Sequence, residues 1–449
     1  MLLAIALLAA PLIIVLTARR PVVGCALLAI GVPLTTALGR DTVIPVLRPN
    51  EAILVLVLAG LALHHLRVRR AFSYIGVDVA ISIFAVGCAL IPWLVLLLSR
   101  ADMDFDTWRA VLGPLQFLAI YLCFAQLELS DRQLTWLLNL TLLVSVVVGA
   151  IAFIELQDFP PGIRDSLLTV IPPNHAPTIY DVVYRPTSTL GVYGAVGAFA
   201  ALNFILALTL ANRPGSRLRD AWLSGVIVVN LASVVASLTW APAAALLLGA
   251  GVVMWYARRV PRQIWIGAGA ALVALVVLWP AVSSRIADQQ LSWGNIQTLD
   301  QRMTNWQIYF LPVLHEHIWF GTGTVIPGDL PAKLADFVDN EFLRIGFRAG
   351  VIGVGLLIAM LSVVGLNAWS SRDSVDPWRR VLGAVALATV VTIVLTGFTA
   401  EYLNFGGLSQ YIAMIFGLLA ARIRYSPQSP LPLAQVSRTE VFTYAMARP

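Results

Sequence analysis

The stretch FVDNEFLRIGFRAGVIG (337–353), followed by VGLLIAMLSVVGL (354–366), decides the fold class. Its second part has no charged residue, and with its flanks it approaches the roughly 20 apolar residues that an α-helix needs to cross a bilayer. Similar segments recur throughout the 449 residues, which are 59% hydrophobic and 12% charged, with a mean hydropathy of +0.83. A soluble protein carries about a quarter charged residues. We therefore predict an all-α polytopic membrane protein, because the apolar runs are too long for barrel strands.

We predict about 12–13 transmembrane helices, the lower number applying if the two N-terminal segments are not both spans. The predicted spans are 2–17, 21–38, 51–65, 77–98, 108–126, 134–154, 191–211, 221–238, 240–257, 264–282, 350–368, 381–399 and 408–421. The organisation that follows is a transmembrane region 1–282 with an outer loop near 155–190, a large extracytoplasmic loop 283–349 with short amphipathic helices, C-terminal spans within 350–422, and a disordered cytoplasmic tail 423–449.

The distribution of arginine predicts the orientation. Alternate loops hold most of the arginines, and the loops between them hold most of the acidic residues. The positive-inside rule places the arginine-rich loops in the cytoplasm. The two longest loops then lie outside, and long loops often carry function, so we expect an active site on the extracytoplasmic face. Because the basic residues sit in short loops between spans, membrane lipid is an expected partner and nucleic acid is not.

Charged residues crowd the predicted start of the helix in the opening stretch. Asn340, Arg344 and Arg348 are spaced four apart and fall on or near one helix face. One interpretation is local: Asp339 or Asn340 caps the helix, and Glu341 pairs with Arg344. The other is a ligand site, because arginine at the membrane boundary is costly unless it snorkels, pairs or faces water, and guanidinium groups match phosphate oxygens in pairs.

Three further arginines lie at predicted outer boundaries. Arg302 precedes an amphipathic segment, TNWQIYFLPVLHEHIWFG (304–321), which we predict to lie at the membrane surface and to stop at glycine. Arg185 and Arg48 each precede a predicted span. Each of the three is either a solvated or interfacial charge or part of a phosphate-binding cavity.

Motifs for metals and cofactors are not found in the sequence. HEH (315–317) places two imidazoles on different helix faces, unlike the i, i+4 pair of a zinc-binding H-E-x-x-H. The sequence contains neither a phosphate-binding G-x-x-x-x-G-K-[ST] loop nor a dinucleotide fingerprint. We therefore expect neither a metal nor a cofactor.

The order of the motifs provides a further clue. QRMTNW (301–306), FGTG (320–323), DNEFL (339–343) and AGVIG (349–353) follow one another in and after the large loop. In this order, and in its span number, the chain resembles the O-antigen ligase and Wzy-type polysaccharide polymerase superfamily of membrane glycosyltransferases. The resemblance covers most of the chain by topology and about residues 185–355 by motif.

Two positions depart from the pattern of the superfamily that the chain resembles. Asp339 stands where the ligase branch usually has His, which favours the polymerase branch. The stretch SLTWAPAAALLLGAG (237–251) has no arginine where the superfamily often has one. The resemblance therefore favours a polymerase or a divergent transferase.

The resemblance implies a donor, partners and a location. The donor is a polyprenyl-pyrophosphate-linked glycan, the acceptor is a glycan or a lipid, and a chain-length regulator is a further expected partner. The location is the bacterial cytoplasmic (inner) membrane, and the activity is polymerisation of the lipid-linked oligosaccharide in cell-envelope or exopolysaccharide biosynthesis. The alternatives are ligase-type single transfer, a lipid-linked glycan transporter or flippase with polar residues in mid-span (Asn139, Asn203, Asn230), and an envelope scaffold.

Each candidate residue has an expected role in this chemistry, which needs cations for the leaving pyrophosphate and a base for the acceptor hydroxyl. The candidate catalytic residues are Asp339 or Glu341 as the base, and Arg302. The expected pyrophosphate ligands are Arg185, Arg302, Arg344 and Arg348, and the further substrate-binding residues are Asn340 and Arg48.

Overall fold

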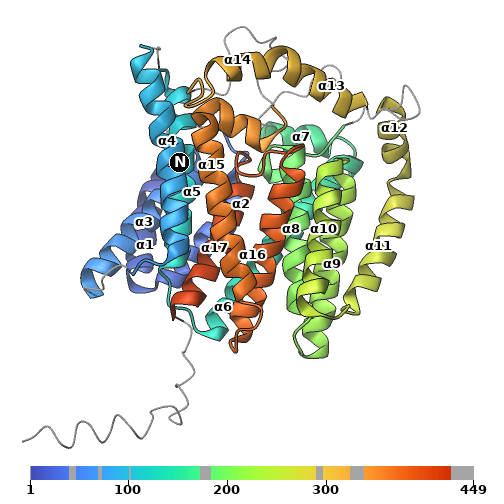
Figure 1. Cartoon of the computed structure of the whole chain (residues 1–449). Helices are drawn as coiled ribbons and strands as arrows, with labels where there is room; N and C mark the ends of the chain where they lie inside the picture. The colour runs from blue at the N-terminus through green and yellow to red at the C-terminus, as the bar shows by residue number, and fades with distance from the viewer. Residues whose placement is uncertain are drawn as a thin grey trace, which may run out of the picture.

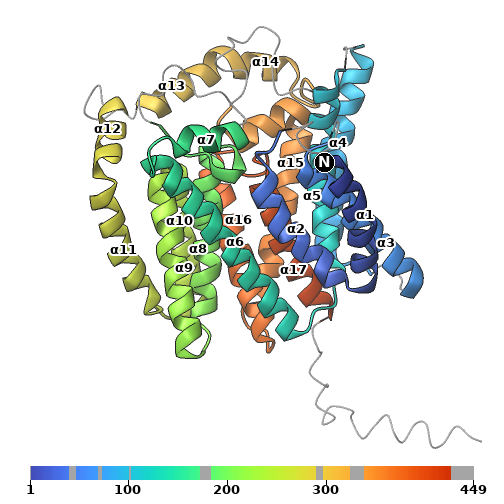
Figure 2. The same cartoon turned by 180° about the vertical axis from the view of Figure 1, so that it is seen from behind.

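The computed structural model describes residues 2–39, 47–68, 73–100, 103–171, 184–289, 297–323 and 338–425. Within these ranges all regular secondary structure is helical, which confirms the predicted all-α class. Long helices stand side by side in one bundle, and short helices lie across one of its ends (Figures 1 and 2). We call this the α13–α14 end, after the helices that lie across it, and the other the opposite end.

The helices follow the predicted spans closely. The long helices are α1 (Leu2–Arg19), α2 (Pro21–Thr35), α3 (Pro49–Val68), α4 (Gly76–Leu98), α5 (Phe105–Ala125), α6 (Asp131–Gln157), α8 (Tyr193–Ala211), α9 (Arg217–Ala236), α10 (Trp240–Ala257), α11 (Gln263–Val277), α15 (Glu341–Ser370), α16 (Pro377–Thr396) and α17 (Leu408–Tyr425). The short elements are α7 (Ile163–Val170), η1 (Ser188–Leu190), α12 (Trp279–Gln289), α13 (Gln297–Asn305), the π-helical η2 (Trp306–Phe310) and α14 (Leu311–Glu316).

Nine helices of the described ranges are long and apolar enough to cross a membrane, and α11 with α12, bent by 71°, makes a tenth if the pair is one span. The chain is therefore a multi-pass membrane protein. Helices α1 and α2 contain shorter apolar stretches, and α17 ends in Arg422 and Arg424, so the number of 12–13 spans stays a prediction. The predicted tail begins within α17, and its residues 426–449 lie outside the described residues.

Polar residues inside the bundle join helices to one another. Asn230 of α9 donates to the Ser145 hydroxyl of α6 at 3.0 Å, and Trp222 donates to Asn139 between the same helices at 3.2 Å. Asn203 donates to a backbone carbonyl of its own helix, α8, at 2.9 Å. Such hydrogen bonds contribute to helix association in lipid. These three asparagines thus have structural partners.

At the opposite end of the bundle, buried ion pairs join α17 to neighbouring helices. Arg424 pairs with Asp78 at the start of α4, and the two side chains are 4% and 0% exposed. Tyr121 of α5 donates to the same carboxylate at 2.6 Å. Arg422 pairs with Asp376, the N-cap of α16. The last turn of α17 is therefore joined to the starts of α4, α6 and α16.

Helix α15 is broken at Gly350, and the break receives the turn that follows α14. Gly350 has φ 64° and ψ −165°, a conformation open essentially to glycine alone. The backbone N–H of Thr322 donates to Phe347 at 2.7 Å, and that of Val351 donates to Ile318 at 2.8 Å. The predicted boundary between loop and span at 349/350 thus coincides with a kink inside a helix that begins at Glu341.

The surface helices pack on the first segment of α15. Phe310 and Phe347 meet edge to face, with ring centroids 5.3 Å apart, in a small apolar cluster that includes Val338. Trp306 donates its indole N–H to the Val338 carbonyl at 2.9 Å. The amphipathic segment predicted for 304–321 is helical, with a π turn at η2, and its last helix, α14, ends at Glu316 with His317 as the C-cap. The expected stop at glycine is therefore wrong, because a turn separates Glu316 from Gly321, where φ is 70°. This packing holds the charged start of α15 beneath α13 and α14 (Figure 1).

Candidate functional site

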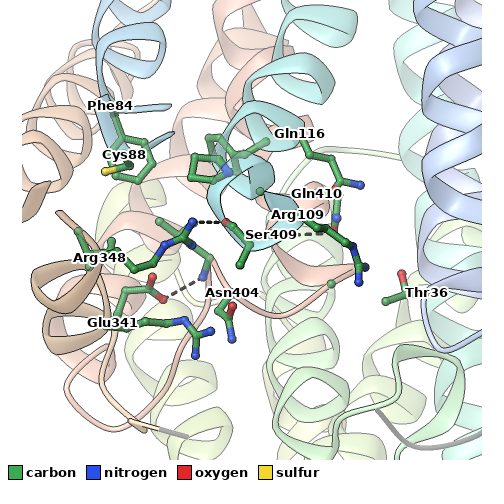
Figure 3. Close-up of a pocket in the computed structure, with 18 of the residues that line it drawn as sticks. Thr36, Phe84, Cys88, Arg109, Gln116, Glu341, Arg348, Asn404, Ser409 and Gln410 are labelled. Carbon is green, nitrogen blue, oxygen red and sulfur yellow. Dashed lines mark hydrogen bonds between the residues drawn. The ribbon is translucent and has the colours of Figure 1, made fainter. Parts of the chain in front are cut away.

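A cavity of about 380 Å³ opens near the α13–α14 end of the bundle, between α3, α4, α5, α15 and the segment that leads into α17. Its charged lining consists of four arginines and one carboxylate: Arg48, Arg109, Arg344, Arg348 and Glu341. Figure 3 shows Glu341 and Arg348 beside Asn404, with Arg109 on another helix. We call this the arginine cavity. Its lining has more positive than negative groups, which favours an anionic ligand.

The first segment of α15 supplies three of the charged groups because helical spacing places them close together. Arg344 and Arg348 are four apart and share a face. Arg344 pairs with Glu401, whose side chain is 1% exposed. Arg348 donates to the backbone carbonyl of Ala110 on α5. Both guanidinium groups are thus fixed by partners on other elements and still line the cavity.

Helices α3 and α5 supply the other two arginines, and Glu51 positions both. One oxygen of Glu51 accepts from Arg109 Nε at 2.8 Å, and the other accepts from the Arg48 backbone N–H at 3.1 Å. Because Glu51 lies in the first turn of α3, its carboxylate also suits the helix dipole. The chain entering α3 is therefore tied to the start of α5.

Glu341 is the carboxylate of the arginine cavity. The residue is 1% exposed, and it accepts a hydrogen bond from the Leu403 backbone N–H at 2.9 Å through Oε2. Its own backbone N–H donates to the Gly397 carbonyl at 2.7 Å. Glu341 therefore joins the start of α15 to the connection between α16 and α17, and among the described residues only its Oε2 accepts a hydrogen bond.

The local interpretation of the opening stretch is confirmed in one part and wrong in another. Asn340 is the N-cap of α15, and its side-chain oxygen accepts from the N–H groups of Phe342 and Leu343, both at 3.0 Å. The expected Glu341–Arg344 pair does not form, because Arg344 turns to Glu401. Since capping occupies the Asn340 side-chain oxygen and the residue is 3% exposed, its substrate-binding role stays a prediction without support in the cavity lining.

A second charged cluster adjoins the cavity. Arg302 Nε lies 3.1 Å from Asp339 Oδ2, and Arg302 also donates to the Thr399 carbonyl at 3.2 Å. Asp339 lies between charged neighbours: burial raises its pKa, and Arg302 and Arg185 oppose that rise. Arg302 and Asp339 do not line the arginine cavity. The two expected base candidates thus occupy different surroundings.

Glu401 connects the two clusters. Its Oε1 accepts from the Asp339 backbone N–H at 2.9 Å, while Oε2 accepts from Arg344 and, at 3.0 Å, from the Asn404 side chain. Burial raises the pKa of Glu401, and Arg344 opposes that rise. A single buried carboxylate therefore sets the distance between the Arg302–Asp339 pair and the arginine cavity.

Arg185 reaches this region on a segment that Glu155 holds in place. The buried Glu155 carboxylate accepts from the backbone N–H groups of Thr187 at 3.0 Å and Ser188 at 2.8 Å, and from the Tyr184 hydroxyl. The Arg185 guanidinium lies 3.4 Å from the centroid of the Tyr193 ring. The structure thus places Arg185 near Asp339, outside the lining of the arginine cavity.

The structure brings together most of the predicted residues and adds others. Arg48, Arg344, Arg348 and Glu341 share the cavity, and Arg185, Arg302 and Asp339 form the cluster beside it. Sequence reasoning missed Arg109, although an arginine at the start of the predicted span 108–126 is the same signal that singled out Arg348. It also missed Glu51 and Glu401 as partners, and only the fold reveals these pairings.

Comparison with known proteins adds no assignment: no protein-family model matches the chain, and no curated protein matches its sequence.

Proposed function

We propose that this protein transfers a glycan from a polyprenyl-pyrophosphate carrier to an acceptor hydroxyl at the surface of the bacterial cytoplasmic membrane. One observation carries the proposal. Arg48, Arg109, Arg344 and Arg348, from three separate parts of the chain, converge on one cavity near the α13–α14 end of the bundle. Glu51 and Glu401 pair with two of these arginines and Glu341 lies in the lining, so four arginines face three carboxylates. The remaining positive charge is one that an anionic ligand would offset.

The chemistry of the cavity suits a pyrophosphate. Guanidinium groups bind phosphate oxygens through paired, charge-assisted hydrogen bonds. Held in place by Glu51, Glu401 and the Ala110 carbonyl, they are preorganised to stabilise the negative charge that develops on a leaving pyrophosphate. The volume of about 380 Å³ is within the range of small-ligand sites, so it accommodates the polar head of a lipid-linked sugar rather than its chain.

The transfer is a displacement at the anomeric carbon. The acceptor oxygen forms a bond to that carbon as the bond from the carbon to pyrophosphate breaks, and the electron pair leaves with the lipid pyrophosphate. The hydroxyl proton passes to a carboxylate. We assign this role to Glu341 in preference to Asp339, because Glu341 lines the arginine cavity and Asp339 does not. No cofactor takes part in the proposal.

We assign the polymerase reaction first, with ligase-type single transfer as the alternative, since Asp339 replaces the histidine of the ligase branch that the chain resembles. The concentration of arginine at the opposite end supports an extracytoplasmic site.

For a transporter, the polar residues in mid-span would be expected to line a path. Asn139, Asn203 and Asn230 instead have bonds within or between helices and do not line the arginine cavity.

The proposal is tested with purified protein and a polyprenyl-pyrophosphate oligosaccharide. We expect Arg348→Gln to lower the turnover rate about 10²–10³-fold, the usual loss when one preorganised donor is removed. Arg100→Gln is the matched control, because Arg100 is exposed, lies in the turn after α4 and is outside the cavity lining. A ladder of lengthening products indicates a polymerase, and one discrete product on a separate acceptor indicates a ligase. Equal turnover by both variants would refute the proposal.

The choice of base has its own test in the same assay. Glu341→Gln should lower turnover by about 10²–10⁴-fold, with unchanged binding of the lipid pyrophosphate, and Asp339→Asn should lower it much less. The reverse order of losses would assign the base to Asp339. If lipid-linked glycan moves between the leaflets of proteoliposomes without any turnover, the protein is a transporter and the proposed enzymatic function is refuted.

A further inference from the structure

A second arginine-lined cavity lies at the opposite end of the bundle, far along the helices from the arginine cavity. Its volume is about 590 Å³, and it lies where α8 and α10 end and α16 begins. These helix ends are together at the bottom of the bundle in Figure 1. Four arginines line it: Arg213, Arg259, Arg372 and Arg380. We call this the lower cavity.

Aromatic rings and neutral acceptors hold three of the four guanidinium groups. Arg213 lies 3.8 Å from the centroid of the Trp378 ring, and Arg372 lies 4.6 Å from that of Trp255. Arg372 also donates to the Trp255 carbonyl at 2.9 Å. Arg259 donates through Nε to the Asn212 side chain at 3.0 Å. Cation–π contacts and amide acceptors orient these groups without neutralising them.

Acidic partners are missing from the lower cavity. Its lining contains no Asp or Glu, and no carboxylate in the described part of the chain lies within ion-pair distance of the four arginines. The same end of the molecule does provide acids elsewhere, since Arg422 pairs with Asp376 and Arg424 with Asp78. The carboxylate of Asp376, beside the lining residue Pro377, is thus engaged by Arg422 outside the lining of the cavity.

Arg213 is affected by neighbouring cations, of which Arg380 lines the lower cavity and Arg219 does not. Burial lowers the pKa of Arg213, and the nearby Arg219 and Arg380 lower it further, against the opposing effect of Asp131 and Asp376. Like charges in a partly buried cavity raise the free energy of the empty site. An anion that binds there recovers this energy, which is the usual basis of phosphate recognition by arginine.

We propose that the lower cavity binds the phosphate headgroup of an anionic phospholipid. The four cations lie at helix ends, where lipid headgroups meet a membrane protein, and basic pockets between transmembrane helices bind such headgroups. Val253, Val381 and Ala384 give the cavity an apolar wall for the glycerol and the start of an acyl chain. This inference is independent of the transferase reaction at the other end.

The test measures phospholipid binding to the purified protein by native mass spectrometry in detergent. Phosphatidylglycerol is titrated against the wild type and against the double variant Arg259→Gln/Arg380→Gln, which changes two exposed side chains of the cavity. Each arginine near an anionic headgroup contributes about a fivefold factor in affinity, so we expect a loss of roughly 30-fold. Zwitterionic phosphatidylcholine should bind more weakly than phosphatidylglycerol to the wild type.

The matched control is Arg217→Gln/Arg262→Gln, which removes the same charge from exposed positions at the same end but outside the cavity lining. Unchanged affinity in this control supports the site, whereas equal losses in the two double variants would show general surface attraction and overturn it. A second arm uses inorganic phosphate and glycerol phosphate. If these soluble anions bind the cavity as tightly as phosphatidylglycerol does, the ligand is not a lipid and the assignment fails.

Discussion

The kink at Gly350 offers a sharp test of how the surface helices and the arginine cavity are joined. Gly350 has φ 64° and ψ −165°, and a Cβ atom at this position would overlap the Trp319 carbonyl. We predict that Gly350→Ala destabilises the protein, because neither the backbone conformation nor the space permits a side chain.

The magnitude follows from two contributions. Placing an alanine in this glycine region costs about 1–3 kcal/mol. Relief of the overlap with the turn stretches the hydrogen bonds from Thr322 to Phe347 (2.7 Å) and from Val351 to Ile318 (2.8 Å), each of which contributes about 1 kcal/mol. The expected loss of unfolding free energy is therefore about 3–5 kcal/mol. In the proposed enzyme, turnover falls as well, since the turn supports the segment that carries Arg344 and Arg348.

The assay is unfolding of purified protein by SDS titration in mixed micelles, followed by circular dichroism. The control is Gly355→Ala, in the same helix, where an added Cβ meets nothing within 4 Å. That variant should gain about 0.5–1 kcal/mol from the lower flexibility of alanine. If Gly350→Ala unfolds at the same SDS concentration as the wild type, the kink does not depend on glycine and the reasoning is refuted.

Three further predictions concern other contacts. Asp78→Asn should lower the free energy of unfolding by about 3–5 kcal/mol in the same assay, because Arg424 stays buried without a carboxylate. The double variant Asp78→Leu/Arg424→Met should recover most of this loss. A double variant as unstable as the single one would contradict the prediction. Asn340→Ala should cost about 1 kcal/mol by removing the cap of α15, whereas Asn340→Ser should retain most of the stability; equal losses would show that capping is not what Asn340 contributes. The fold raises the pKa of Asp339 above 3.8, so the protonated carboxyl is favoured in the folded state. The stability of the wild type relative to Asp339→Asn should therefore rise as the pH falls through the raised pKa toward 3.8. An opposite trend in pH-dependent unfolding would refute this prediction.

The apolar runs sufficed to predict the helices and their order, because a helix in lipid must satisfy its own backbone and its composition shows this directly. The spacing of Asn340, Arg344 and Arg348 was informative for the same reason: helical periodicity is local, so residues four apart share a face wherever the helix lies. A glycine turn after this helical segment was also predictable, since positive φ favours glycine, although α14 itself already ends at Glu316. All these features depend on residues close together in the chain.

Only the tertiary structure decided which charges meet. Arg344 lies within reach of Glu341 along the helix, yet it pairs with Glu401, 57 residues later. Arg109 enters the arginine cavity because α5 packs beside α3. Asp339 stays outside that cavity, where the Glu401 carboxylate accepts from the Asp339 backbone N–H. The rotation of each helix about its axis depends on its packing against all its neighbours, and this rotation determines which face lines a cavity. The sequence by itself therefore determined the helices and their charged ends, and packing chose the partners of those charges.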